Sequence, residues 1–427
     1  MMTTEHAIDA SRLLAGRTRA VVLAAMWPQQ PDGLLAAVIE AARAADIGLT
    51  VLFADLTGSL AFLDEAAEHD VLEGRLQLVS VAGAIPKRWS PHIDYLPQSL
   101  WDVDRLIGTG EIPVDILLAR VVATAKPEHV ALGGMVGYTP AALRTGCTVG
   151  LEVVPGHTFA GPEPVPLDRA DAVVHGPAST HRRTIRFSAE QEAIGHAVAG
   201  LVPDGATVQL GLGAVPEAVI PHLRTKRDLG VHSGILSAGI RELIAAGVVT
   251  GRRKTAEPGW HVATGVLDWP AHQCPGLALQ PVAQTHAPDR LLAQERLWAV
   301  NSAFEIDLAG QANAEFTDGV RVASGGGQAD FVRAAHASPG GAAVLALPAR
   351  TRQGRSRIVA CLPAPHIPTS PGAEIDVVVT EHGTAWLRGR TAREKAAALI
   401  AVAHPADRPA LSAAVAHPLP ERNHCSS

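Results

Sequence analysis

The chain has 427 residues, nearly half of them apolar, with a modest charged fraction and a formal net charge of −6. A chain of this length exceeds one ordinary hydrophobic core, so two or three domains are expected. The basic residues form no cluster. Nucleic acid is therefore excluded as an expected partner, because phosphate binding needs a concentrated basic surface.

The four cysteines stand far apart and form no CxxC pair. We therefore expect neither a zinc site nor a disulfide framework, and no bound metal. The segment Met1–Gly16 lacks the apolar run of a signal peptide. No apolar stretch reaches the ~18 residues of a membrane span. These features predict a cytoplasmic protein without a membrane partner.

In the first part of the chain, short apolar runs alternate with stretches rich in Ala and Leu. This alternation is typical of βαβ units, in which helices cover a mostly parallel sheet. Pro31–Asp32 is expected to open a helix that runs through Ala45, since Pro suits a first turn. The strands predicted here are Val21–Ala25, Leu49–Leu56, Leu76–Ala82, Asp115–Ala123 and Ala170–His175.

A polar and basic segment over Gly176–Phe187 interrupts this rhythm and is interpreted as a linker. Ser188 and Gln191 then form a capping box for a predicted helix over Ala189–Leu201. A second α/β unit follows, and its last clear helix is Ala392–Ala403. Its predicted strands are Val208–Gly211, Leu229–His232, Leu297–Asn301, Ala343–Leu347, Arg357–Leu362 and Ile375–Thr380.

The fold class expected from this pattern is α/β, with two open domains whose mostly parallel sheets are covered by helices. We place the first domain at residues 1–178 and the second at 186–418. A tail follows over 419–427.

Two glycine-rich loops lie in the second half. Gln209–Pro216 ends a predicted strand and opens a helix over Glu217–Leu223, and Ser324–Phe331 carries three successive glycines ahead of another helix. Exposed backbone N–H groups in such loops can hold a pyrophosphate or stabilise an oxyanion. A tight turn or a surface loop is the alternative for each segment alone. Two such loops in one half of the chain favour a ligand.

Polar side chains also stand where predicted strands end. Asn301 can donate to a carbonyl oxygen, or it can satisfy a backbone group, which is the commoner case. Glu381 and His382 place a carboxylate and an imidazole at the edge where open α/β sheets bind ligands, although single residues there are more often plain surface groups. Other histidines, His286 among them, show no metal-ligand spacing.

From about Thr18 to Val415 the chain resembles the acetyl-CoA hydrolase/transferase family, which includes 4-hydroxybutyrate and succinyl/acetate CoA-transferases. The segments that carry the resemblance follow one another in the family's order. They are Tyr95–Pro97, Gly150–Val154, Gly211–Pro216, Asp228–His232, Ala299–Gln311, Gly326–Phe331, Ser356–Val359, Val379–Gly383 and Ala401–Pro405. The resemblance implies two open α/β domains that bind acyl-CoA between them, in a homodimer or larger homo-oligomer.

In that family a glutamate attacks the thioester, and the acid is exchanged through an acyl-glutamyl anhydride and a glutamyl-CoA thioester. The resemblance puts this glutamate two residues after the motif histidine His232, where the chain has Gly234. Ala238 stands in place of an aspartate, His382 in place of a tyrosine, and Gly372 in place of an arginine. The departures cluster near the reacting centre, whereas the motifs of the CoA loops persist.

The resemblance assigns the coenzyme A of an acyl-CoA substrate to the two glycine-rich loops. The residues assigned to it are Gly211, Gly213, Ala214, Gly325, Gly326, Gly327 and Gln328. Gly234 and Ala238, which lack the family's carboxylates, and Glu152 are assigned to the substrate pocket.

These assignments predict direct transfer of the acyl group from acyl-CoA to water, or to an amine or hydroxyl of a small-molecule acceptor or of the same acyl chain. His382 is the expected general base, with His232 as second candidate and Glu381 as orienter. Asn301 and the N–H groups of Gly326–Gly327 are expected to stabilise the oxyanion.

Two alternatives stay open, the first of them from another class of protein. One is a non-catalytic acyl-CoA-binding or assembly protein. The other is a conventional CoA-transferase that uses a displaced carboxylate such as Glu152 or Glu381.

Overall fold

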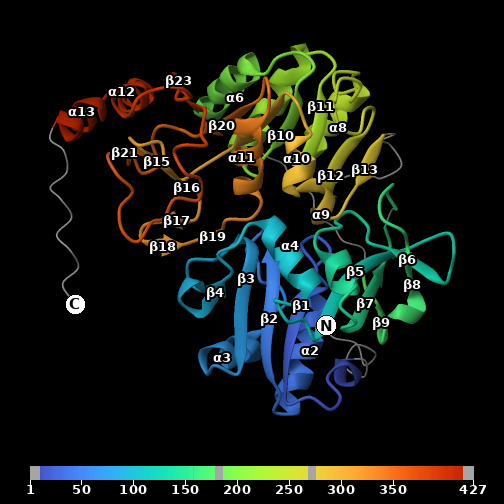
Figure 1. Ribbon diagram of the computed structural model, residues 1–427. Coiled ribbons are helices and arrows are strands. Elements are labelled where there is room, and N and C mark those ends of the chain that lie inside the picture. Colours follow the sequence, from blue (N-terminus) through green and yellow to red (C-terminus); the bar gives the residue numbers. More distant parts are fainter. Residues whose placement is uncertain (1–9, 157, 178–185, 268–275, 417–427) are drawn as a thin grey trace.

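The protein is described by a computed structural model over residues 10–156, 158–177, 186–267 and 276–416. These residues form two α/β halves, each built around its own sheet (Figure 1). The prediction of two α/β units with mostly parallel sheets is confirmed. Most of the predicted linker, 178–185, and the predicted tail lie outside the described residues, so the exact domain limits stay predictions.

The N-terminal half has a parallel sheet with β1 at its centre and apolar strands covered by helices. Its parallel strands are β1 (Arg19–Ala24), β2 (Gly48–Asp55), β3 (Leu76–Ala84), β4 (Ile93–Tyr95), β5 (Ile116–Ala123), β7 (Thr148–Val154) and β9 (Ala172–His175). Its helices are α2 (Asp32–Ala44), α3 (Glu65–Leu72), α4 (Leu100–Thr109) and α5 (Thr139–Leu143). Antiparallel β6 (His129–Ala131) and β8 (Val165–Pro166) add a flap. Nearly continuous apolar runs such as β5, interrupted by Arg120, form strands here because parallel strands are buried on both faces.

The C-terminal half has a second sheet in which only the last pair is antiparallel. Its strands, in order across the sheet, are β13 (Leu277–Leu279), β12 (His261–Val266), β11 (Gly230–Leu236), β10 (Thr207–Leu210), β14 (Leu297–Asn301), β20 (Ala342–Ala346), β22 (Val377–Thr380) and β23 (Gly383–Trp386). The helices are α6 (Ala189–Leu201), α7 (Ala214–Val219), α8 (Ala238–Ala245), α9 (Val282–Thr285), α10 (Pro288–Leu292), α11 (Gln328–Ala337), α12 (Ala392–Val402) and α13 (Arg408–Ala416).

One short strand joins the halves. β19 (Ala323–Ser324) pairs antiparallel with the end of β3, at Gly83 and Ala84. The Oγ atoms of Ser80 and Ser324 lie 2.7 Å apart beneath this pairing. The glycine-rich loop that follows β19 is therefore held against the edge of the N-terminal sheet (Figure 1).

Three predicted elements need correction. Of the strand predicted over Arg357–Leu362, only β21 (Ile358–Val359) forms, and it belongs to a small side sheet with β15 (Glu305–Asp307) and β16 (Ala312–Asn313). The following residues turn to the surface, where Cys361 is exposed.

The other two corrections concern the site. The helix predicted over Glu217–Leu223 begins earlier, at Ala214, and passes into a 3-10 helix over Ile220–Thr225. β11 extends past His232 to Leu236, because Ile235 and Leu236 pair with β12. Gly234 therefore lies within a strand and not in a turn.

Within the described residues, no helix combines the length and the apolar character needed to cross a bilayer.

Candidate active site

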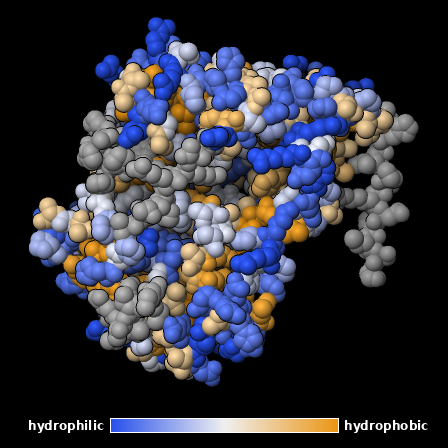
Figure 2. All heavy atoms as spheres, turned by 180° about the vertical axis from the view of Figure 1, so that it is seen from behind, coloured by the Kyte–Doolittle hydropathy of each residue, from blue (hydrophilic) through white to orange (hydrophobic). Residues whose placement is uncertain are grey.

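A cavity of about 620 Å³ is bordered by residues of both halves. The N-terminal half contributes apolar side chains, among them Met26, Leu100 and Met135. Figure 2 shows the face opposite to that of Figure 1, on which apolar side chains gather about a hollow between the two lobes. A cavity of this size and lining is typical of sites for small organic ligands.

Both glycine-rich loops line this cavity. All seven residues that the sequence assigned to coenzyme A are part of its wall: Gly211, Gly213, Ala214, Gly325, Gly326, Gly327 and Gln328. The N–H of Leu100 donates to the carbonyl oxygen of Gly326 at 3.0 Å, which fixes the second loop against α4. Among the described residues, no acceptor pairs with the N–H groups of Gly326 and Gly327. These donors can therefore bind a carbonyl oxygen or an oxyanion.

Asn301 ends β14 at the cavity and is buried. Its amide exchanges two hydrogen bonds with the amide of Gln209, at 3.0 and 3.2 Å. Since each NH₂ group carries two hydrogens, the pair leaves one donor on Asn301 for a ligand. The amide pair thus holds the predicted oxyanion donor in one orientation.

Gly234 also lines the cavity, and the imidazole of His286 lies directly in front of it. A Cβ atom added at Gly234 would lie 3.1 Å from Nε2 of His286 and 3.7 Å from the ring of Phe331. A Cβ atom added at Gly327 would lie only 2.5 Å from the same Nε2 atom. The ring is thus placed between two glycines, and it fits there because neither has a side chain.

His286 is 2% exposed and packs edge-on against Phe331, with ring centroids 4.9 Å apart. Its Nδ1 lies 2.7 Å from Oγ1 of Thr285. Burial, and after it the neighbouring His232, lower the pKa of His286 to about 3, so the ring is neutral at physiological pH. The sequence did not identify this residue as functional, because its contacts come from strands and loops distant in the chain.

His232, the second predicted base, lies behind His286 and does not border the cavity. It is fully buried, and its Nε2 is 3.0 Å from the carbonyl oxygen of Thr285. Burial, and then the charge of Lys254, lower the pKa of His232 to about 3. His232 thus helps to hold Thr285, and with it the neighbouring His286, in place.

The remaining predicted residues lie outside the cavity lining. His382 is at the edge pair β22–β23, 3.5 Å from Glu381, whose carboxylate accepts a hydrogen bond from the N–H of Ala349 at 2.9 Å. Glu152 is buried in the N-terminal half, 3.3 Å from the guanidinium of Arg120. Ala238 begins α8. The structure therefore does not bring these side chains together with Gly234.

The charge of the cavity wall is positive. Among the lining residues that the structure describes, Arg357 carries a formal charge and no carboxylate is present. One guanidinium nitrogen of Arg357 donates to the carbonyl oxygen of Ala303 at 3.3 Å, and its Nε is buried without a partner in the described chain. Burial lowers the pKa of Arg357 from its ordinary high value. The wall therefore suits an uncharged or anionic ligand.

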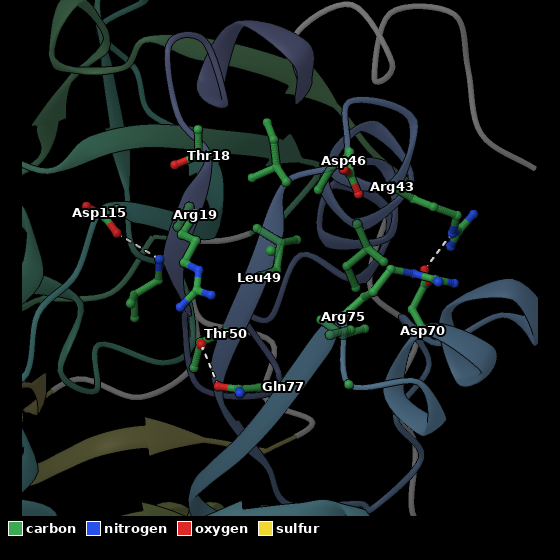
Figure 3. Close-up of a pocket in the computed structure, with 18 residues that line it drawn as sticks. Thr18, Arg19, Arg43, Asp46, Leu49, Thr50, Asp70, Arg75, Gln77 and Asp115 are labelled. Carbon is green, nitrogen blue, oxygen red and sulfur yellow. Dashed lines mark hydrogen bonds and ion pairs between the residues drawn. The ribbon is translucent and has the colours of Figure 1, made fainter.

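A second hollow, of about 580 Å³, lies at the opposite, amino-terminal ends of β1, β2 and β3 (Figure 3). Its charged groups largely pair with one another: Asp70 lies 2.5 Å from Arg43 and 2.7 Å from Arg75. Asp115 accepts a hydrogen bond from the N–H of Val21 at 2.8 Å. These contacts hold strand ends together, so we place the site in the cavity between the halves.

Comparison with known proteins matches this architecture to enzymes that act on CoA thioesters. The family model of the acetyl-CoA hydrolase/transferase C-terminal domain matches residues 266–415. The 4-hydroxybutyrate coenzyme A transferase of Clostridium kluyveri is 33% identical over 330 residues, covering 75% of this chain and 77% of that protein. The chain belongs to the acetyl-CoA hydrolase/transferase family.

Two solved structures are similar over nearly the whole chain. RipA from Yersinia pestis has a TM-score of 0.85 at 28% identity, covering 97% of this chain and 96% of that one. A 4-hydroxybutyrate CoA-transferase from Porphyromonas gingivalis has a TM-score of 0.75 at 26% identity, covering 97% of each chain. The predicted CoA-transferase fold is thereby confirmed.

Proposed function

We propose that this protein transfers the acyl group of an acyl-CoA directly to water, or to an amine or hydroxyl acceptor, without a covalent intermediate at residue 234. The substrate class is supported by the family and by relatives named as coenzyme A transferases. The second part of the proposal, the absence of a covalent intermediate at residue 234, does not follow from membership of the family.

One observation supports the absence of a covalent intermediate. Gly234, where the resemblance puts the family's glutamate, faces the neutral ring of His286, and no carboxylate is present among the described residues that line the cavity. Glycine has no group that can attack a thioester. Ping-pong exchange of one carboxylate for another therefore has no nucleophile at this position.

The other requirements of acyl transfer remain available. The N–H groups of Gly326 and Gly327 and the amide of Asn301 border the cavity and can stabilise the negative charge that develops on a thioester oxygen. One such donor typically contributes roughly 10² to 10³ in rate. The apolar wall from Met26, Leu100 and Met135 suits an acyl chain.

The test is the release of free thiol from a panel of acyl-CoAs, with and without amine and alcohol acceptors. We expect thiol release with at least one thioester, and no exchange of label between acyl-CoA and free acetate. Binding of acyl-CoA without thiol release under any condition would favour the alternative of a binding protein. Rapid acetate exchange would favour a conventional transferase with a displaced carboxylate.

A further inference from the structure

The strongest unassigned feature of the cavity is the free nitrogen of His286. The residue is 2% exposed, and its Nε2 points into the space between Gly234 and Gly327, both of which line the cavity. Among the residues that the structure describes, no hydrogen-bond partner reaches this atom, whereas Nδ1 is bonded to Thr285. A ring nitrogen that faces a cavity without a protein partner is available to a ligand or to water.

Building on the proposed direct acyl transfer, we propose that His286 is the general base of the reaction and takes the proton of the attacking water, hydroxyl or amine on Nε2.

The hydrogen bonds of Thr285 allow the tautomer in which Nε2 can accept this proton. The hydroxyl of Thr285 lies 3.3 Å from the carbonyl oxygen of Pro281, which can only accept, and 2.7 Å from Nδ1 of His286. A hydroxyl has one proton, so when it donates to Pro281 its oxygen accepts from Nδ1–H, and when it donates to Nδ1 the ring proton is on Nε2. The first arrangement leaves the lone pair on Nε2, facing the cavity, and is the tautomer that the proposal requires.

The distance of Nε2 from residue 234 matches the reach of the missing carboxylate. The oxygens of a glutamate lie three bonds beyond Cβ and so reach roughly 3 to 4 Å from it. Nε2 lies 3.1 Å from the Cβ position at Gly234. The imidazole therefore occupies the distance from the strand at which a side chain from residue 234 would end. A proton acceptor thus lies within the reach of the side chain that the family has at this position.

The reaction balances without another reactant. The nucleophile attacks the thioester carbon while its proton passes to Nε2, and the oxygen, now negative, lies among the N–H donors of Gly326 and Gly327. The tetrahedral intermediate collapses by breaking the C–S bond, and the imidazolium protonates the leaving sulfur. The products are the acyl ester, amide or acid and free CoA thiol, and His286 returns to its neutral form.

The surroundings of the ring determine how the two proton transfers occur. Burial and the neighbouring His232 lower the pKa of His286 to about 3, so the ring is unprotonated before attack but is a weak base, and the proton passes to Nε2 only as the nucleophile bonds to the thioester carbon and becomes acidic. An imidazolium with such a low pKa is a strong acid towards the departing thiolate, since an ordinary cysteine thiol has a pKa of about 8.5. His232 and His382 do not border the cavity and cannot take this proton directly.

The test replaces His286 by Gln, which keeps a polar side chain but cannot accept the proton, and by Ala. The matched control is His261→Gln, because His261 is equally buried, has a pKa lowered by burial to about 4, and does not line the cavity. For each protein, thiol release from the best acyl-CoA gives kcat and KM, titration calorimetry gives the dissociation constant, and thermal unfolding reports folding. We expect His286→Gln to lose roughly 10² to 10⁴ in kcat while it still binds acyl-CoA. The His261→Gln control is expected to keep the wild-type kcat.

Three results would overturn the assignment. The first is a His286→Gln protein that folds, binds and turns over at the wild-type rate. The second is a loss of kcat that follows His382→Ala and not His286→Gln. The third is an acylated His286 in protein quenched during turnover, which would make the ring a nucleophile. A wild-type protein that turns over no thioester overturns the proposed function and this inference with it, whereas an active wild type with an equally active His286→Gln overturns the inference alone.

Discussion

Adding a single methyl group at Gly234 tests the packing that separates this site from one with a glutamate nucleophile. The new Cβ would lie 3.1 and 3.3 Å from two atoms of the His286 ring, which is closer than ordinary van der Waals contact. Overpacking of this kind costs about 1 to 3 kcal/mol. Replacing glycine by alanine within a strand restores roughly 0.5 to 1 kcal/mol. We therefore expect Gly234→Ala to lower the free energy of unfolding by a net of about 1 kcal/mol, within a range of about 0 to 2.5 kcal/mol.

A double-mutant cycle with His286→Ala identifies the cause. Once the ring is removed, the two closest contacts of the methyl group are gone, and the next, with the ring of Phe331 at 3.7 Å, is an ordinary one. The cost of Gly234→Ala should then fall, with a coupling free energy of roughly 0.5 to 3 kcal/mol from urea unfolding curves. The matched control is Gly200→Ala, since a Cβ atom at Gly200 meets nothing within 4 Å. Additive costs in the cycle would refute the argument that His286 fills the space in front of residue 234.

Three further outcomes are expected. Asn301→Ala should lower the free energy of unfolding by about 1 to 3 kcal/mol, because it leaves the buried amide of Gln209 without its partner. The same substitution should lower kcat for thiol release. An unchanged urea midpoint and an unchanged kcat would contradict this prediction. Burial raises the pKa of Asp330 to about 7, where its carboxylate accepts from the N–H of Trp101. The folded state therefore holds this proton more tightly than the unfolded chain, and the stability that it confers is complete below about pH 4 and is lost as the pH rises through about 7. Unfolding curves from pH 4 to 8 should show this loss in the wild type and not in Asp330→Asn, and identical profiles would contradict it. Acyl-CoA at about 100 times its dissociation constant should stabilise the protein by roughly 2.7 kcal/mol, measured by thermal shift, and the absence of any shift with every thioester would argue against binding.

Local signals explain which elements could be predicted. The capping box of Ser188 and Gln191 gives the first residue of α6, since both of its hydrogen bonds lie within four residues of chain. β14 follows in the same way from an apolar run that ends at Asn301. β19 could not be predicted, because a two-residue strand has no periodicity and depends on β3. The extension of β11 to Leu236 likewise depends on β12.

The same difference between local signals and long-range contacts decides which site residues could be predicted. The family resemblance assigned both glycine-rich loops to one ligand; the first follows the parallel strand β10, whereas the second follows β19, whose pairing with β3 places it at the cavity. His382 also follows a strand, but β22 is four strands from β11 in the sheet, roughly 19 Å at the usual spacing. His286 follows a four-residue helix and has no motif. Its importance depends on its distance from Gly234 and Gly327, which the sequence does not contain.

The most direct test of the central claim is the intact mass of the wild-type protein, quenched within its turnover of an acyl-CoA that releases thiol. Direct transfer predicts that thiol accumulates while the protein keeps its unmodified mass, since Gly234 offers no group to acylate. A mass increase equal to the acyl group or to CoA, mapped to a carboxylate such as that of Glu152 or Glu381, would contradict the account.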